Sequence, residues 1–335
     1  MINLAVPGAT LPQLRRPRPG DLPLLQVLLA APRGFCAGVE RAIASVEDAL
    51  AFHGSPVFVR RPIVHNLAVV RSLERKGAVF VEELHEVPDA SVVVLSAHGV
   101  APGIKKEASR RGLKVYDAVC PLVAKVHRHV LRYWREGRHV LLVGHKGHPE
   151  IDGTLGHMPD GAATLVSTPE EAAALDLPAD APLAYAVQTT FSVAEAAAIT
   201  EILTSRFSDL AAPIASDICY ATTNRQAAIS ALARRAHAVI VVGEAFSSNA
   251  QRLAETASLS CESVQLVPGP AELDWSQLPR RGGTVAVTSA ASTPEESVSE
   301  VVQALGSRYL VSATQVGNEE SVRFRRVEVP RPAQV

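Results

Sequence analysis

Three of the four cysteines in this chain lie where an apolar stretch gives way to a helix-like pattern. They are Cys36 in "PRGFCAGVERA", Cys120 in "KVYDAVCPL" and Cys219 in "ASDICYATT". A thiolate at a helix N-terminus is stabilised by the free backbone N–H groups and by the helix dipole. Taken singly, each cysteine is as readily a buried small hydrophobe, and Cys261 in "SLSCESV" is interpreted only in that way.

Taken together, the three cysteines at these turns favour one soft metal centre. Three thiolates suit zinc or an iron–sulfur cluster, and with three protein ligands one metal position stays open for water or substrate. The chain has no C-x-x-C pair, which argues against zinc-finger and thioredoxin-type sites. Disulfides are not expected in the reducing cytoplasm, where we expect this protein to reside.

A carboxyl with the potential for acid chemistry follows a histidine in "GHPE". His148 and Glu150 are two residues apart, and the proline between them favours extended backbone at its predecessor. In an extended segment both side chains project to one face. Near an anionic ligand and a desolvated centre, the carboxyl would hold its proton more tightly and could act as a general acid. A glutamate at the surface or at a helix entry is the plainer alternative.

The elements that must position these residues alternate along the chain. Val-, Leu- and Ile-rich runs predict strands at 26–30, 56–60, 91–97, 113–118, 139–144, 183–187, 238–243, 263–267 and 284–289. Apolar residues at spacings of three and four predict helices at 38–52, 121–135, 193–207, 222–236 and 294–305. Continuous apolar runs are typical of parallel strands that helices cover on both faces. The fold class is therefore predicted as α/β, with ligands expected beyond the carboxyl ends of the strands.

The three cysteine turns also indicate a diverged internal repeat of about 90 residues, in which each unit offers one cysteine. We therefore expect three pseudo-symmetric α/β units with mainly parallel sheets. The predicted divisions are a disordered N-terminal extension at 1–24, a first strand and cysteine loop at 25–37 that joins the third unit, the three units at 38–119, 120–215 and 216–305, and a C-terminal tail at 306–335. An ordinary three-layer α/β domain with cysteines at chance positions is the alternative.

Charge and composition exclude several classes of partner. The 335 residues include 33 Lys and Arg against 34 Asp and Glu, and aromatic residues make up 4%. This balance provides no basic field for nucleic acid or an anionic membrane, and few platforms for stacking bases. No apolar run has the roughly 18 residues that a membrane span needs, and the Pro- and Arg-rich start lacks the apolar core of a secretory signal. We expect a cytoplasmic protein with a small-molecule ligand, without nucleic acid or membrane partners.

Eight separated stretches also carry a resemblance to one family. They are "PRGFCAGVERAI", "VHN", "SAHGV", "DAVCPLVAKVH", "GHKGHPEIDGT", "QTTFS", "DICYATTNRQ" and "SSN". In this order, the chain resembles the 4-hydroxy-3-methylbut-2-enyl diphosphate reductases, the terminal enzymes of the non-mevalonate isoprenoid pathway. The resemblance implies three α/β units around a central [4Fe–4S] cluster, one per chain, held by Cys36, Cys120 and Cys219. The fourth iron of such a cluster binds the substrate hydroxyl.

The same resemblance implies the reaction and the remaining site residues. The substrate would undergo reductive dehydroxylation to isopentenyl and dimethylallyl diphosphate through two single-electron transfers, with Glu150 as the acid and Thr189 as the hydroxyl that relays the proton. Gln188 and Thr190 would lie in the same lining. The substrate-binding residues implied are His65, His98, His148, Thr190, Ser247, Ser248, Asn249 and Ser292.

Two sequence features bear on the electron source and on the role of the phosphates. The chain has no G-x-G-x-x-G turn, so a separate ferredoxin or flavodoxin is the expected electron donor. It has no G-x-x-x-x-G-K-[ST] loop either, so the phosphates must be bound by other groups. The implied phosphate contacts are mostly uncharged side chains, whereas phosphoryl transfer typically uses Lys or Arg clamps. The diphosphate is therefore interpreted as a handle and not as the reacting group.

Two loops depart from the family pattern. Ala290 in "TSAAS" stands where the family usually has glycine, and alanine would be strained if that position required positive φ. Glu244 and Phe246 in "GEAFSSNA" replace shorter or basic residues. Two other functions remain open from the residues: a zinc hydrolase or lyase built on the three cysteines, and a non-enzymatic α/β protein that binds phosphorylated metabolites.

Overall fold

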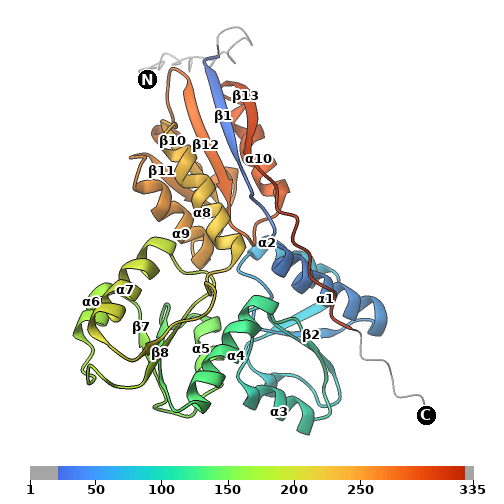
Figure 1. Ribbon diagram of the computed structural model, residues 1–335. Helices are drawn as coiled ribbons and strands as arrows, with labels where there is room; N and C mark the ends of the chain where they lie inside the picture. The colour runs from blue at the N-terminus through green and yellow to red at the C-terminus, as the bar shows by residue number, and fades with distance from the viewer. Residues whose placement is uncertain (1–21, 329–335) are drawn as a thin grey trace, which may run out of the picture.

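The computed structural model describes residues 22–328, whose strands form three separate sheets. Every strand pairing in these sheets is parallel. Figure 1 shows the three α/β units grouped around a common centre. The predicted α/β class with three parallel-sheet units is confirmed. The predicted N-terminal extension lies almost entirely outside the described residues, as does the end of the predicted C-terminal tail.

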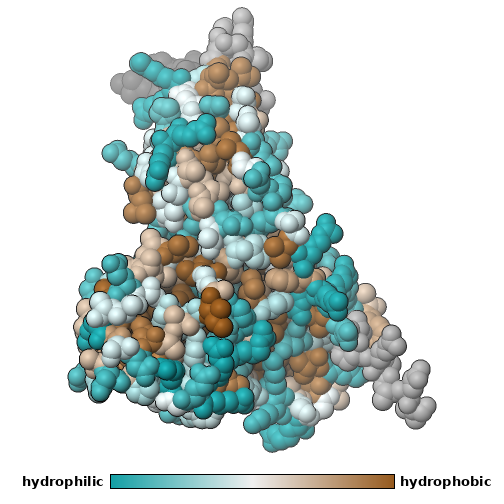
Figure 2. All heavy atoms as spheres, in the orientation of Figure 1, coloured by the Kyte–Doolittle hydropathy of each residue, from teal (hydrophilic) through white to brown (hydrophobic). Residues whose placement is uncertain are grey.

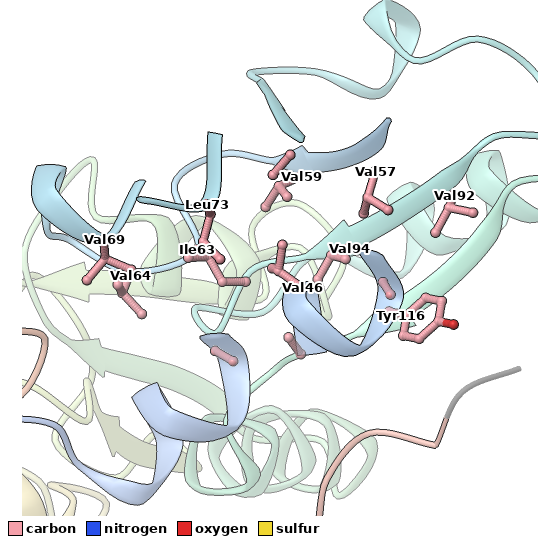
Figure 3. Close-up of a cluster of buried hydrophobic side chains, with 14 of the residues drawn as sticks. Val46, Val57, Val59, Ile63, Val64, Val69, Leu73, Val92, Val94 and Tyr116 are labelled. Carbon is pink, nitrogen blue, oxygen red and sulfur yellow. The ribbon is translucent and has the colours of Figure 1, made fainter. Parts of the chain in front are cut away.

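The first unit has a four-stranded sheet in the order β3-β2-β4-β5. Its elements are α1 (Ala37–His53), β2 (Val57–Arg60), α2 (Leu67–Arg75), β3 (Ala78–Val81), the short 3-10 helix η1 (Leu84–Glu86), β4 (Val92–Leu95), α3 (Pro102–Arg110) and β5 (Lys114–Asp117). Figure 3 shows one of its cores, where Val46 of α1 packs with Val59, Val94 and Tyr116 from the strands. β4, with the sequence VVVL, is buried at every residue, as expected for a strand that helices cover on both faces.

The second unit repeats this arrangement with the order β7-β6-β8-β9. Its elements are α4 (Pro121–Arg135), β6 (His139–Val143), α5 (Pro149–Leu155), β7 (Ala163–Val166), α6 (Pro169–Ala174), β8 (Leu183–Val187), α7 (Val193–Arg206) and β9 (Leu210–Ala211). Proline begins α4 and α5, where its fixed φ suits the first turn and its missing N–H costs no hydrogen bond. α4 therefore begins directly after Cys120 and α5 directly after His148, and both of these are predicted site residues.

The third unit has five strands in the order β11-β10-β12-β1-β13. Its elements are β1 (Leu24–Ala31), α8 (Tyr220–Ala233), β10 (Ala238–Val242), α9 (Ser248–Ser258), β11 (Val264–Val267), the 3-10 helices η2 (Pro270–Glu272) and η3 (Trp275–Gln277), β12 (Gly283–Ser289), α10 (Glu295–Leu305) and β13 (Leu310–Gly317). The first strand of the chain thus lies between two of the last. After β1 the chain leaves this sheet through Cys36 and enters α1 of the first unit.

Each predicted strand and helix is present, but several elements were not predicted. β13 lies in the segment for which the sequence predicts a tail, and most of its side chains are exposed. β9 has only two residues. Such strands lack the continuous apolar run on which the prediction depends. Among residues 22–328, no helix combines the length and the apolar character that a membrane span requires, and Figure 2 shows polar and apolar residues interspersed over one face.

Candidate active site

One pocket of about 700 Å³ is lined by residues from all three units. It follows the carboxyl ends of strands in each sheet, where ligands of parallel α/β folds bind. Thirteen of the predicted site residues line this pocket: Cys36, His65, His98, Cys120, His148, Glu150, Thr189, Thr190, Cys219, Ser247, Ser248, Asn249 and Ser292. Gln188, predicted to lie in the same lining, is not part of it and instead donates to the Thr190 hydroxyl.

The three predicted metal-ligating cysteines are each the N-cap residue of a helix. Cys36 precedes α1, Cys120 precedes α4 and Cys219 precedes α8. All three thiols are free of disulfides. Burial raises the pKa of Cys36, and it raises the pKa of Cys120 to about 12 and that of Cys219 to about 11, although backbone N–H groups of the following helices act in the opposite direction. A cation would therefore be needed to hold these groups as thiolates at neutral pH.

Glycine at position 38 leaves room beside two of the three sulfurs. A Cβ added to Gly38 would lie 2.9 Å from the Cys120 sulfur and 3.7 Å from the Cys36 sulfur, so glycine leaves this cradle open. The Thr222 hydroxyl lies 3.2 Å from the Cys219 sulfur. In the described part of the chain, no three His, Cys, Asp or Glu side chains converge on one point as ligands of a single ion. An iron–sulfur cluster does not require that convergence, because each thiolate binds a different iron.

Glu150 lies in the first turn of α5 and is buried, with 2% of its surface exposed. Thr189 holds both carboxyl oxygens: its backbone N–H donates to Oε1 at 2.7 Å and its hydroxyl to Oε2 at 2.8 Å. Burial raises the pKa of Glu150 to about 7 despite these two hydrogen bonds, and the charge of buried Asp217 adds to the increase. The carboxyl can therefore carry a proton at neutral pH, and Thr189 is placed to exchange it.

Three histidines meet on one side of the pocket. The ring centroids of His65 and His98 are 4.3 Å apart, and that of His148 lies 5.4 Å from His65 and 5.7 Å from His98. Burial lowers the pKa of all three rings, to about 3 for His148, and the charge of neighbouring rings lowers those of His98 and His148 further. A bound anion would reverse this effect, since it favours the protonated imidazole.

Hydroxyl and amide groups of the second and third units complete the lining. Ser247 caps α9 and accepts from the Ala250 N–H, while the Asn249 Oδ1 accepts from the Ala291 N–H at 2.8 Å. Gln188 donates to the Thr190 hydroxyl at 2.7 Å, which fixes the orientation of that hydroxyl. The free N–H groups at the start of α9 favour an anion.

The two loops that depart from the family pattern are accommodated differently. Ala290 is buried, and it is absent from the non-glycine residues with positive φ among residues 22–328, so alanine brings no backbone strain. The loop after β10 instead hydrogen-bonds to the first unit through Glu244 and Phe246, and these two contacts are called the clasp below. The Glu244 carboxylate accepts the Leu67 N–H at the start of α2 at 3.1 Å, and the Phe246 carbonyl accepts from the His65 ring at 3.3 Å.

Sequence reasoning missed three polar residues that support the site. Asp217 is fully buried beside Lys125 and His129 of α4, and it accepts the Val187 N–H at 3.2 Å. Arg225 is also buried and donates to the Gly34 carbonyl, which precedes the Cys36 loop. Thr222 contacts the Cys219 sulfur. Aspartate, arginine and threonine are common surface residues, so residue type alone does not indicate a role for them. The only signal in the sequence is that Asp217 lies two residues before Cys219.

Comparison with known proteins gives a consistent result. The family model described as LytB protein matches residues 27–306. The 4-hydroxy-3-methylbut-2-enyl diphosphate reductase of Gluconobacter oxydans is 50% identical over 307 residues, covering 90% of this chain and 91% of that protein. The reductase of the same name from Glaesserella parasuis is 45% identical over 314 residues, covering 93% and 99%.

Solved structures agree with the sequence comparisons. The E-1-hydroxy-2-methyl-but-2-enyl-4-diphosphate reductase of Plasmodium falciparum superposes with a TM-score of 0.85 at 35% identity, covering 91% of this chain and 96% of that one. A structure titled as (E)-4-hydroxy-3-methyl-but-2-enyl diphosphate reductase, the terminal enzyme of the non-mevalonate pathway, gives 0.61 at 28% identity, covering 84% and 99%. With its three parallel sheets and its shared central pocket, this chain belongs to the LytB protein family, whose curated relatives are named 4-hydroxy-3-methylbut-2-enyl diphosphate reductase.

Proposed function

We propose that the protein reduces 4-hydroxy-3-methylbut-2-enyl diphosphate to isopentenyl and dimethylallyl diphosphate, the last step of the non-mevalonate isoprenoid pathway, in the cytoplasm. One observation carries the proposal. Residues from eight separated stretches of sequence, each implied by the family resemblance, line one pocket between three sheets. Family membership gives the substrate class, and the pocket offers groups of the right chemistry for both ends of that substrate.

We propose Cys36, Cys120 and Cys219 as the ligands of a [4Fe–4S] cluster. When bound, the cluster supplies two electrons one at a time, together with one iron that has no protein ligand. The chain contributes three buried sulfurs at helix N-termini and the space left open by Gly38.

We propose Glu150 as the acid that protonates the departing hydroxyl. The overall change replaces C–OH by C–H, consumes two electrons and two protons, and releases water. A carboxyl with a pKa of about 7 is protonated in a useful fraction at neutral pH and gives up that proton readily. Thr189, bonded to Glu150 through both its N–H and its hydroxyl, orients the substrate oxygen and passes on the proton.

We propose that the diphosphate is held by the histidines and by the hydroxyl and amide groups of the third unit. His65, His98, Ser247, Asn249 and Ser292 would contact the phosphates, and His148 would lie between them and the reacting carbon. These contacts fix the allylic end beside the cysteines, so that binding energy of the non-reacting part orients the reacting part. Thr190 and Ser248 extend the same lining, at a hydroxyl–hydroxyl distance of 3.4 Å.

The electrons would come from a ferredoxin or a flavodoxin, because the sequence contains no dinucleotide fingerprint. The test is an anaerobic assay of protein purified without oxygen, with 4-hydroxy-3-methylbut-2-enyl diphosphate and a chemical one-electron reductant. We expect both C5 diphosphates as products, and iron and sulfide close to four of each per chain, as a cubane cluster contains. Zinc in place of iron, or no product despite a full cluster, would contradict the proposal.

A further inference from the structure

A second hollow lies beside the cysteine centre and opens to solvent. Phe35 and Ala37, the neighbours of Cys36, line it, and so does Tyr220, the residue after Cys219. Its volume is about 970 Å³, and it shares no lining residue with the substrate pocket. Two of the three sulfurs are therefore one residue away from a surface that the substrate does not use.

Tyr220 connects the two cysteine helices at this surface. Its hydroxyl accepts the Ala37 N–H at 3.3 Å, so its half-buried ring bridges the start of α8 and the start of α1. Phe35 is also half-buried. The hollow is thus lined by aromatic side chains that are covalent neighbours of Cys36 and Cys219, which brings the surface close to both cysteines along the chain.

The outer wall of the hollow is the segment 318–328, which follows β13. Figure 1 shows this dark-red segment running beside α1. The Arg41 guanidinium donates to the Arg325 carbonyl at 2.9 Å, and Arg326 pairs with Asp48 of α1 at 2.7 Å. These contacts hold the segment against the first unit and present its arginines around the opening.

The charge at the hollow is positive although the chain as a whole carries −1. Arg41, Arg323 and Arg326 line the hollow together with two carboxylates, Glu40 and Glu320. The Glu320 carboxylate is already paired with a buried guanidinium, that of Arg225, at 2.9 Å, and Arg326 is likewise paired with Asp48. This leaves Arg41 and Arg323 against Glu40. Arg41 donates to backbone carbonyls and so retains its charge.

We propose that this hollow is the docking site of an acidic one-electron carrier protein, which delivers electrons to the cysteine centre through the Phe35 and Tyr220 side. This inference rests on the proposed function, which needs two electrons that the chain itself does not supply. In each encounter the carrier is oxidised by one electron and the centre is reduced by one. Two encounters and two protons account for the conversion of C–OH to C–H and water.

The geometry suits such a partner. Electron-transfer encounters bury small areas and depend on complementary charge more than on apolar contact. A solvent-open hollow with a net positive lining attracts an acidic carrier and releases it after transfer. Because the two hollows are separate, the carrier can dock while substrate occupies its own pocket.

The test uses the cluster-loaded enzyme with reversed charges at the rim. Arg323→Glu and the double variant Arg323→Glu/Arg326→Glu are compared with Arg280→Glu, an exposed arginine on the third unit outside the hollow. Each is assayed at low ionic strength with a reduced acidic ferredoxin, and separately with reduced methyl viologen. We expect the KM for ferredoxin to rise about fivefold or more in the rim variants and its salt dependence to flatten. The viologen-driven rate and the Arg280→Glu control should match wild type.

Two outcomes would overturn the inference: a wild-type KM for ferredoxin in the rim variants, or an equal loss in the Arg280→Glu control. Ferredoxin binding is also titrated directly, by the chemical shifts of its surface amides, and this binding should weaken in the rim variants alone. Absence of any turnover with viologen in the wild type would contradict the proposed function. In that case the titration still decides whether the hollow binds the carrier.

Discussion

Glu150 shows how the surroundings of one residue determine its chemistry. The carboxyl is buried, and that burial raises its pKa from an ordinary value near 4.5 to about 7. Because the folded-state pKa is raised, the protonated form predominates below about pH 7 and is lost as the pH rises through that value. A group acting as an acid in this state is most effective on the acid side of neutrality.

We predict that kcat falls as the pH is raised through about 7, and that Glu150→Gln reduces kcat by at least about 100-fold, the usual contribution of a positioned acid. The variant should keep the visible absorbance of a loaded cluster, because Glu150 is not among the proposed ligands. Single-turnover rates between pH 6 and 8.5 with a chemical reductant measure both effects. Turnover close to wild type in Glu150→Gln would remove the acid role.

Gly38 controls the space between two of the sulfurs. We predict that Gly38→Ala lowers the iron and sulfide content of the purified protein, because its Cβ would lie 2.9 Å from the Cys120 sulfur. Packing at that distance forces the helix or the cysteine to move. The matched control is Gly103→Ala in α3, where an added Cβ meets nothing within 4 Å. If Gly38→Ala contained as much iron and sulfide as the Gly103→Ala control, the space beside the Cys36 and Cys120 sulfurs would be large enough for an added methyl group.

The residues of the site were predictable to different extents. The cysteines and Glu150 could be identified from side-chain type and spacing alone. Cysteines at helix N-termini indicate metal-binding thiolates, and the His-Pro-Glu sequence indicates a carboxyl that could donate a proton. The serines, Asn249 and Thr189 were identified only through the family resemblance, because such residues usually cap helices. Asp217 and Arg225 were not identified, because their roles depend on burial that only the folded chain creates.

At the scale of elements, the clasp between the loop after β10 and α2 connects two units across the pocket. Glu244 supplies a carboxylate to the N-terminus of α2, where a negative charge is favourable, by about 1 kcal/mol or less. The helix that it caps begins two residues after His65. The clasp therefore fixes His65, one of the proposed phosphate-binding groups, from a neighbouring unit.

We predict that Glu244→Ala raises the KM for the substrate several-fold and leaves kcat nearly unchanged, because His65 binds the non-reacting end in the proposed function. Steady-state kinetics with a chemical reductant separate the two parameters. Glu262→Ala, an exposed glutamate in the turn before β11, is the matched control. A fall in kcat at constant KM would instead indicate that the clasp acts on the chemical step.

Strands could be predicted from the sequence where burial on both faces requires a continuous run of apolar residues. β10 is buried along its whole length and β6 from its second residue on, and from the second residue both strands consist only of valine, leucine and isoleucine. β13 forms eight residue pairs with β1, yet it lies at the edge of the sheet and remains mostly exposed. β13 pairs with β1 through backbone hydrogen bonds, which do not depend on side-chain type. The sequence of β13 therefore does not predict this strand.

At the scale of the whole molecule, Arg225 joins three distant parts of the chain. Its guanidinium donates to the Gly34 carbonyl at 2.9 Å, to the Ala221 carbonyl at 3.1 Å and to the Glu320 carboxylate at 2.9 Å. It thus ties α8 both to the loop that carries Cys36 and to the segment after β13. The side chain is fully buried, so these bonds are sheltered from solvent.

We predict that Arg225→Met destabilises the protein by about 3–5 kcal/mol, because Glu320 is left with a charge that has lost its partner. The double variant Arg225→Met/Glu320→Gln should recover part of that loss, since it removes the unpaired charge. Thermal unfolding measures the effect, and trypsin cleavage after Arg323 reports release of the final segment. Equal stability of wild type and Arg225→Met would show that the guanidinium contributes no net stabilisation.

The position of β1 has a consequence for biosynthesis. β1 is translated long before β12 and β13, its two neighbours in the sheet. Until those strands have been made, β1 lacks its sheet partners, and the Cys36 turn that follows it cannot be fixed in its final place. The three-cysteine site can therefore form only after β12 and β13 have been synthesised.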